Sequence, residues 1–141
     1  MKVKLNRKNN NFHFVAESDN GNSVSMDASP AIGGENKGVR PMEMLLMAIG
    51  GCSGIDVVSI LKKQKQEIKN FSIEVDGERE AGKEPSLYKH IEVVFLLEGD
   101  MDPSKAKRAV ELSMDKYCSV AKTLEKTAEI NYSVKLNGVR I

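Results

Sequence analysis

The sequence of 141 residues contains no tryptophan, and aromatic residues make up only 5% of it. Proteins that bind single-stranded nucleic acids stack the bases on aromatic side chains, and nucleic-acid-binding domains usually carry a strong excess of basic residues. Here 21 Lys and Arg residues nearly balance 20 Asp and Glu residues, so the net charge is +1. We therefore expect no nucleic acid among the partners of this protein.

Cysteine is also scarce, since the chain has only Cys52 and Cys118, which lie 66 residues apart. A disulfide scaffold needs more cysteines in a shorter chain, and a structural zinc site needs ligands at short spacing. The only histidines are His13 and His90, and no pair among these four residues has ligand spacing. The sequence therefore predicts neither a disulfide framework nor a metal site.

A nucleotide site is not expected either. The segment 33–40 (GGENKGVR) has glycines spaced as in a phosphate-binding loop. Val39 and Arg40, however, stand where such a loop carries Lys followed by Ser or Thr. Because the phosphate-directed lysine and the magnesium-binding hydroxyl are both missing, we predict that the protein uses no cofactor.

The first 14 residues are charged and lack the apolar run of a secretory signal peptide, which favours a reducing, cytoplasmic location. One segment, 41–61, is long and apolar enough to resemble a membrane span. It contains Glu43 and Asp56, and a charge at the centre of a span costs about 2.5–3.5 kcal/mol on insertion scales. We interpret the segment as a helix buried in protein, so no membrane is expected.

The hydrophobic pattern predicts a single domain, residues 1–141, of the α+β class. Apolar residues alternate in residues 1–28, which indicates a β-hairpin region, and a Gly-rich loop follows at 29–40. The central helix is expected over 41–69, and residues 70–141 read as a β-α-β remainder. Because short turns join most of the strands, the sheets should be largely antiparallel and packed against the helices.

The central apolar helix predicts a homodimer. It is apolar nearly all round, and a chain of this length has little else with which to cover it. A second copy would bury the surface, with an interface above about 2,000 Å² in total.

Two cysteines are the candidates for chemistry. Cys52 lies among Gly51, Ser53 and other small residues, which would leave its thiol reachable, and Cys118 lies at the break between two predicted helices. Taken singly, each is more readily interpreted as an ordinary small core residue, the usual place of a free cysteine. Asp56 is one helical turn beyond Cys52 and would disfavour its thiolate unless a cation such as Arg40 offsets the charge.

The stretch GVRPMEMLLMAIGGCSGIDVVSIL, residues 38–61, resembles the helix-and-cysteine segment of the OsmC/Ohr family. A second segment, Tyr117-Cys118-Ser119-Val120 followed by Thr123-Leu124, is similar to the later cysteine of that family. The predicted order of strands and helices also fits. The resemblance implies an intertwined homodimer in which sheets surround two long central helices.

The resemblance also implies a thiol peroxidase that reduces organic or inorganic hydroperoxides. Carried over by position, Cys52 would be the peroxidatic thiol and Cys118 the resolving thiol. An external dithiol would then reduce the intramolecular disulfide. The partners implied are a second copy, a small hydroperoxide and that reductant.

One position departs from the family pattern. The family's peroxidases carry Glu directly after the proline that begins the helix, whereas this chain has Met42 there and Glu43 one place later. One residue turns a helix by about 100°, so Glu43 points in another direction. Arg40, or else Arg7, would supply the cation beside the thiol. The alternative function is a non-catalytic or redox-sensing dimer that binds a small apolar ligand.

Overall fold

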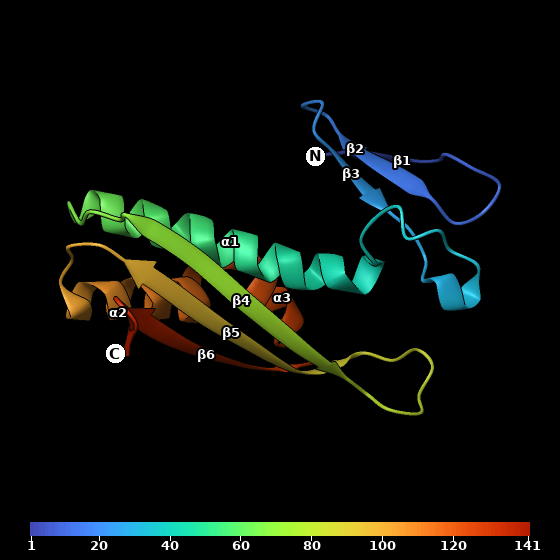
Figure 1. The fold of residues 1–141 in the computed structure, drawn as a ribbon. Coiled ribbons are helices and arrows are strands. Elements are labelled where there is room, and N and C mark those ends of the chain that lie inside the picture. The colour runs from blue at the N-terminus through green and yellow to red at the C-terminus, as the bar shows by residue number, and fades with distance from the viewer. The chain divides into compact units, whose positions relative to one another are not determined.

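The computed structural model describes residues 1–141, which form two compact units, Met1–Leu45 and Leu46–Ile141 (Figure 1). The first unit contains a three-stranded antiparallel sheet in the order β1-β2-β3. Its strands are β1 (Val3–Arg7), β2 (Phe14–Ser18) and β3 (Ser23–Met26), followed by the 3-10 helix η1 (Pro30–Ile32). All three strands lie within residues 1–28, where the alternation of apolar residues predicted a β-hairpin region.

One carboxylate organises the loop that follows β3. Asp27 is 2% exposed, and its side chain accepts backbone hydrogen bonds from Ala28 (2.8 Å), Glu35 (3.1 Å) and Lys37 (3.0 Å). These bonds, led by the one from Lys37, hold the pKa of Asp27 below its ordinary value of 3.8. The Gly-rich segment is therefore a pinned loop with a fixed backbone.

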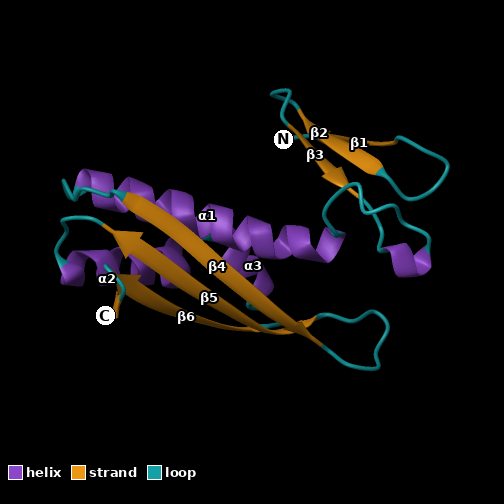
Figure 2. Cartoon of the chain, viewed as in Figure 1, coloured by secondary structure: helices purple, strands orange, loops and turns teal.

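The second unit is a four-stranded sheet packed against helices (Figure 2). The strand order is β4-β5-β6-β7, and the helices lie on one face of the sheet. The elements are α1 (Pro41–Lys63), which begins in the first unit, β4 (Asn70–Arg79), β5 (Tyr88–Glu98), α2 (Pro103–Leu112), the π-helical turn η2 (Ser113–Tyr117), α3 (Ser119–Leu124), β6 (Glu129–Leu136) and β7 (Val139–Arg140).

The pairing of β5 with β6 is parallel, in sheets that are otherwise antiparallel as expected. A parallel pair needs a long crossover connection, and here α2, η2 and α3 provide it. The register places Phe95 beside Val134 on the buried face. Cys118 therefore lies on the crossover connection.

The core forms where the inner face of the sheet meets α1. Phe71 and Phe95 stack with ring centroids 6.3 Å apart. A Cβ on Gly50 would lie 3.2 Å from Val75 Cγ2, and one on Gly54 would lie 2.8 Å from Ile73 Cδ1. The two glycines are one helical turn apart, so they allow α1 to approach β4 closely.

Helix α1 ends at Lys63, six residues earlier than the sequence predicted. Lys65 has a positive φ of 55°, and the Gln66 amide donates to the Leu61 carbonyl at 3.0 Å while the Lys65 amide donates to the Lys62 carbonyl at 3.0 Å. This is a Schellman termination, which usually has glycine where this chain has Lys65. The missing glycine explains why the sequence pattern failed to mark the end.

Much of α1 is left uncovered by its own chain. Met47 is 52% exposed and Ile55 is 74% exposed, and a Cβ on Gly51 would meet nothing within 4 Å. The helix is also long and apolar enough to cross a membrane, a test that core helices of non-membrane proteins pass as well. An apolar helix face this exposed needs a partner surface of some kind.

Candidate functional site

Cys52 lies in the middle of α1 and is half-buried. Its neighbours explain the access to its thiol, because Gly51 adds no side chain and Ser53 turns inward. The Ser53 hydroxyl is fully buried and donates to the Ile49 carbonyl at 2.7 Å, one turn earlier in the same helix. The Ser53 hydroxyl is therefore satisfied within α1.

Cys118 is fully buried and joins two helical segments. Its amide donates to the Ser113 carbonyl at 2.8 Å, a bond across five residues that closes the π-helical turn η2. Its sulfur accepts a hydrogen bond from the Ala121 amide at 3.4 Å and so caps the start of α3. Both the backbone and the sulfur of Cys118 are held in place.

The structure brings the two cysteines into contact. Burial is the largest influence on Cys118 and raises the pKa of its thiol to about 11. The backbone amides of Ala121 and Val120 favour its thiolate and lower the pKa, while the neighbouring Cys52 thiol raises it through hydrogen bonding and charge repulsion. Cys118 is accordingly a protonated thiol at neutral pH, beside a second and more accessible thiol.

A hydrogen-bonded cluster lies one turn beyond Cys52. The Ser113 hydroxyl is 3.1 Å from Asp56 Oδ2 and 3.2 Å from the Ser53 carbonyl oxygen. Asp56 and Ser53 belong to α1, which carries Cys52. Ser113 begins η2, the turn that Cys118 directly follows, so the cluster joins these two elements.

Arg40 and Glu43 belong to the first unit and bond to its loop and to each other. Glu43 Oε2 accepts a hydrogen bond from the Arg40 amide at 2.8 Å, as in a capping box at the start of α1. The Arg40 guanidinium donates to the carbonyls of Asp27 (3.2 Å) and Gly38 (2.9 Å) and to Asn36 Oδ1 (2.7 Å). All three acceptors are uncharged, so the Arg40 guanidinium forms no ion pair with them.

The histidines bond elsewhere. His13 Nε2 is 2.6 Å from the Ser25 hydroxyl in the first unit, and His90 Nδ1 is 3.3 Å from Glu129 Oε2 in the second. No group of three or more His, Cys, Asp or Glu side chains lies together as a metal site would require.

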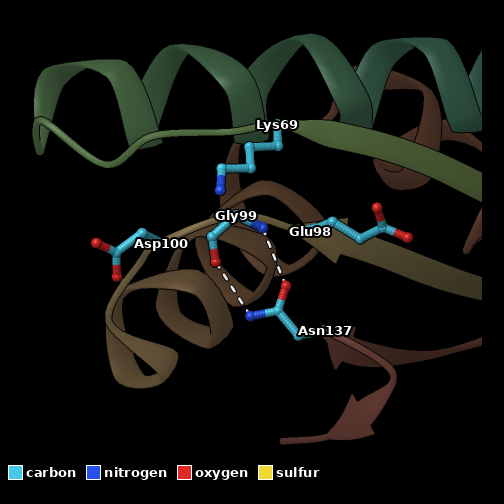
Figure 3. A pocket seen from close by; sticks show the side chains of 5 residues that line it. All are labelled: Lys69, Glu98, Gly99, Asp100 and Asn137. Carbon is cyan, nitrogen blue, oxygen red and sulfur yellow. Dashed lines mark hydrogen bonds between the residues drawn. The ribbon is translucent and has the colours of Figure 1, made fainter.

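A hollow of about 520 Å³ lies at one end of the sheet and is lined by Lys69, Glu98, Gly99, Asp100 and Asn137 (Figure 3). The Asn137 amide both donates to the Gly99 carbonyl (3.1 Å) and accepts from the Gly99 amide (3.0 Å). The Asn137 side chain is thus used to hold the turn at Gly99. The cysteine pair remains the better candidate for chemistry.

Sequence reasoning selected both cysteines and Asp56, which the structure gathers in one place. It missed Ser113, because a serine within a predicted helix gives no signal of its own. The one signal in the sequence was the break between two predicted helices at Cys118. It indicated an irregular turn but could not show that Ser113, the first residue of that turn, contacts α1.

Comparisons with known proteins agree with the fold. A sequence profile of the family described as OsmC-like protein matches residues 34–133. Protein YhfA of Escherichia coli strain K12 is 42% identical over 124 residues, which cover 87% of this chain and 89% of YhfA. A crystal structure of a hypothetical protein from Aquifex aeolicus VF5 is 35% identical, covers 96% of both chains and has a TM-score of 0.79.

The fold extends to more distant proteins. OhrB of Bacillus subtilis, an organic hydroperoxide resistance protein, superposes with a TM-score of 0.62 over 96% of this chain and 98% of its own, at 20% identity. The profile spans most of the chain, and the identity to YhfA extends over nearly its whole length. The chain belongs to the OsmC-like protein family.

Proposed function

We propose that the protein is a thiol peroxidase that reduces organic or inorganic hydroperoxides in defence against oxidative stress, with Cys52 as peroxidatic and Cys118 as resolving cysteine. The observation that carries the proposal is the contact between two thiols that lie 66 residues apart in the sequence. The fold shared with proteins named for organic hydroperoxide resistance supports the choice of substrate class.

The reaction balances as follows. The Cys52 thiolate attacks the terminal oxygen of ROOH, the O–O bond breaks, and the alcohol ROH leaves after taking up a proton. The resulting Cys52 sulfenic acid then condenses with the Cys118 thiol, which forms the S–S bond and releases water. An external dithiol reduces this disulfide and becomes oxidised itself, which restores both thiols.

The order of the two cysteines follows from their surroundings. Cys118 is fully buried, and its raised pKa keeps it protonated, so it is a poor first nucleophile. Cys52 is more accessible. In the second step the Cys118 sulfur loses its proton as it attacks the sulfenic acid beside it, and that proton leaves with the departing hydroxide as water.

Arg40 and Glu43 remain the proposed helpers of the Cys52 thiolate, with Arg7 as the other candidate cation. Arg40 carries a positive charge that its bonding partners do not cancel. Glu43 fixes the Arg40 backbone through the hydrogen bond to its amide. If this pair serves the thiolate, Arg40→Gln should slow sulfenic acid formation, while Lys37→Gln in the same loop should not.

A homodimer is part of the proposal. Two apolar surfaces support it, namely the exposed side of α1 and the face of the first sheet that bears Val3 and Leu5, which are 61% and 50% exposed. The dithiol reductant fits a reducing compartment, and the cytoplasm is the one we propose.

The test separates the two cysteines. One equivalent of an organic hydroperoxide should leave a sulfenic acid at Cys52 in Cys118→Ser, detectable by dimedone labelling and mass spectrometry. Cys52→Ser should stay largely reduced over the same time, and the wild type should form one intramolecular disulfide. First oxidation at Cys118 would reverse the roles. Reaction no faster than a free cysteine at both positions would instead favour the non-catalytic or redox-sensing alternative.

A further inference from the structure

The hydroxyl of Ser113 joins the helix that carries Cys52 to the turn that carries Cys118. It is fully buried and lies within hydrogen-bonding distance of Asp56 Oδ2 and of the Ser53 carbonyl, both on α1. The carbonyl of the same residue accepts the amide of Cys118 at 2.8 Å. One residue thus bonds to α1 through its side chain and to Cys118 through its backbone.

We propose that Ser113 and Asp56 are positioning residues that hold Cys118 against Cys52 and so set how readily the two thiols form a disulfide. This inference rests on the proposed function, because the positioning of the two thiols matters to the cell only if they form a disulfide during the reaction. A buried hydroxyl between a carboxylate and a carbonyl fixes distance and angle together. The effective concentration of one thiol at the other depends on such fixed geometry, so loosening the contact should reduce it.

The π-helical turn makes this arrangement possible. The bond from the Cys118 amide to the Ser113 carbonyl spans five residues, and the next segment, α3, starts directly after it. With this wider turn, Ser113 faces α1 while Cys118 faces Cys52. Single π-helical turns are frequent at functional sites for this kind of re-aiming.

The chain offers a closely matched control. Ser53 and Ser113 are both fully buried serines. The Ser53 hydroxyl bonds only within α1, to the carbonyls of Ile49 and Gly50, whereas the Ser113 hydroxyl reaches another element. Ser53→Ala therefore makes the same chemical change at the same depth and keeps the backbone carbonyl that Ser113 contacts.

The experiment is a thiol–disulfide equilibrium in glutathione buffers, in which the protein dithiol reduces glutathione disulfide to two glutathione thiols and itself becomes the disulfide. The equilibrium constant, measured by acid quench and alkylation, should fall by about tenfold in Ser113→Ala, or about 30 mV in reduction potential. It should stay within about twofold of wild type in Ser53→Ala. Asp56→Asn retains an acceptor oxygen and should stay near wild type, whereas Asp56→Ala should behave like Ser113→Ala.

The outcomes separate this inference from the proposed function, because the equilibrium requires no peroxide. A normal constant in Ser113→Ala, or an equal loss in Ser53→Ala, overturns the positioning role. If Ser113→Ala does not fold, as judged by circular dichroism, Asp56→Ala decides the matter from the other side of the bond. If the equilibrium constant falls in Ser113→Ala while the wild-type protein does not react with hydroperoxides, the positioning role is upheld and the peroxidase function is rejected.

If the protein reacts with peroxide, a second test compares the rates of the two steps, sulfenic acid formation and disulfide closure. Ser113→Ala should form the Cys52 sulfenic acid at the wild-type rate and close the disulfide about tenfold more slowly. A slower first step with normal closure would contradict the role assigned to Ser113. A change that merely loosened the fold would slow neither step selectively.

Discussion

The ring of Tyr88 lies over Gly77, so that a Cβ on the glycine would come within 2.5 Å of Tyr88 Cε1 and 2.9 Å of Leu46 Cδ2. Gly77 is in the middle of β4, where its neighbours Asp76 and Glu78 continue the pairing with β5. The glycine is therefore needed to make room for a buried aromatic ring, and it does not end the strand.

Gly77→Ala should lower the free energy of unfolding by about 1–3 kcal/mol, because the new methyl group would force the Tyr88 ring and Leu46 to shift. Urea denaturation followed by circular dichroism would measure it. Ser72→Ala, an exposed position on the same strand, should change stability by less than about 0.5 kcal/mol. Equal stability of the two variants would show that the Tyr88 ring can shift.

The buried thiol gives a pH prediction. In Cys52→Ser, iodoacetamide should modify Cys118 slowly at pH 9, with the rate rising only toward pH 11, since burial is the main cause of its raised pKa of about 11. In urea the midpoint should return to the ordinary value near 9.0. Between these values the folded chain retains a proton that the unfolded chain loses, so stability should fall as pH rises through this window. Intact-mass spectrometry follows the modification.

Asp27 predicts acid sensitivity of the loop that follows β3. Its pKa is lowered in the folded state, so its contribution is complete above the ordinary value of 3.8 and is lost as pH falls through the lower folded value. Amide protons of Glu35 and Lys37 should be protected from hydrogen exchange at pH 6 and lose protection below pH 3.8. Asp27→Asn should lose part of that protection even at pH 6, whereas Asp19→Asn, an exposed acceptor, should not.

The exposed side of α1 predicts the oligomeric state. In a monomer, Ile55→Arg would be almost neutral, because Ile55 is 74% exposed. In the proposed homodimer it would place a charge in the apolar contact and should produce monomers at micromolar concentration in light scattering. Val139→Arg alters an exposed apolar residue of β7 and should remain dimeric. A wild type that is monomeric under these conditions would contradict the dimer.

Local patterns in the sequence predicted most of the fold. Ile91, Val93, Phe95 and Leu97 alternate and are all buried on β5. Asp102 followed by proline is a pattern typical of a helix start, and its carboxylate accepts hydrogen bonds from the amides of Ser104 (2.7 Å) and Lys105 (3.2 Å). Such features depend on neighbours a few residues away, so a single sequence is enough to recognise them.

The features that escaped prediction depend on distant residues. Gly77 makes room for the ring of Tyr88, which belongs to another strand, so no pattern around the glycine indicates its role. The parallel register of β5 and β6 depends on a whole helical connection, and the role of Ser113 depends on a helix about 60 residues earlier. The two cysteines could be named as a pair only through resemblance, since nothing local to either one indicates the other.

The crossover connection that carries Cys118 also determines at what stage of folding the two cysteines meet. His90 pairs with Glu129, which lies 39 positions later in the sequence. Contacts between such distant residues form slowly, because the entropy cost of closing the loop must be met before the contact stabilises the chain. Cys52 and Cys118 are farther apart still. A nascent or partly folded chain therefore carries two ordinary, separated thiols, and they become neighbours only when α1 and the crossover connection have packed together. Oxidative chemistry at this site is in that sense a property of the finished fold, and chains caught before completion are exposed to mispaired disulfides with other molecules.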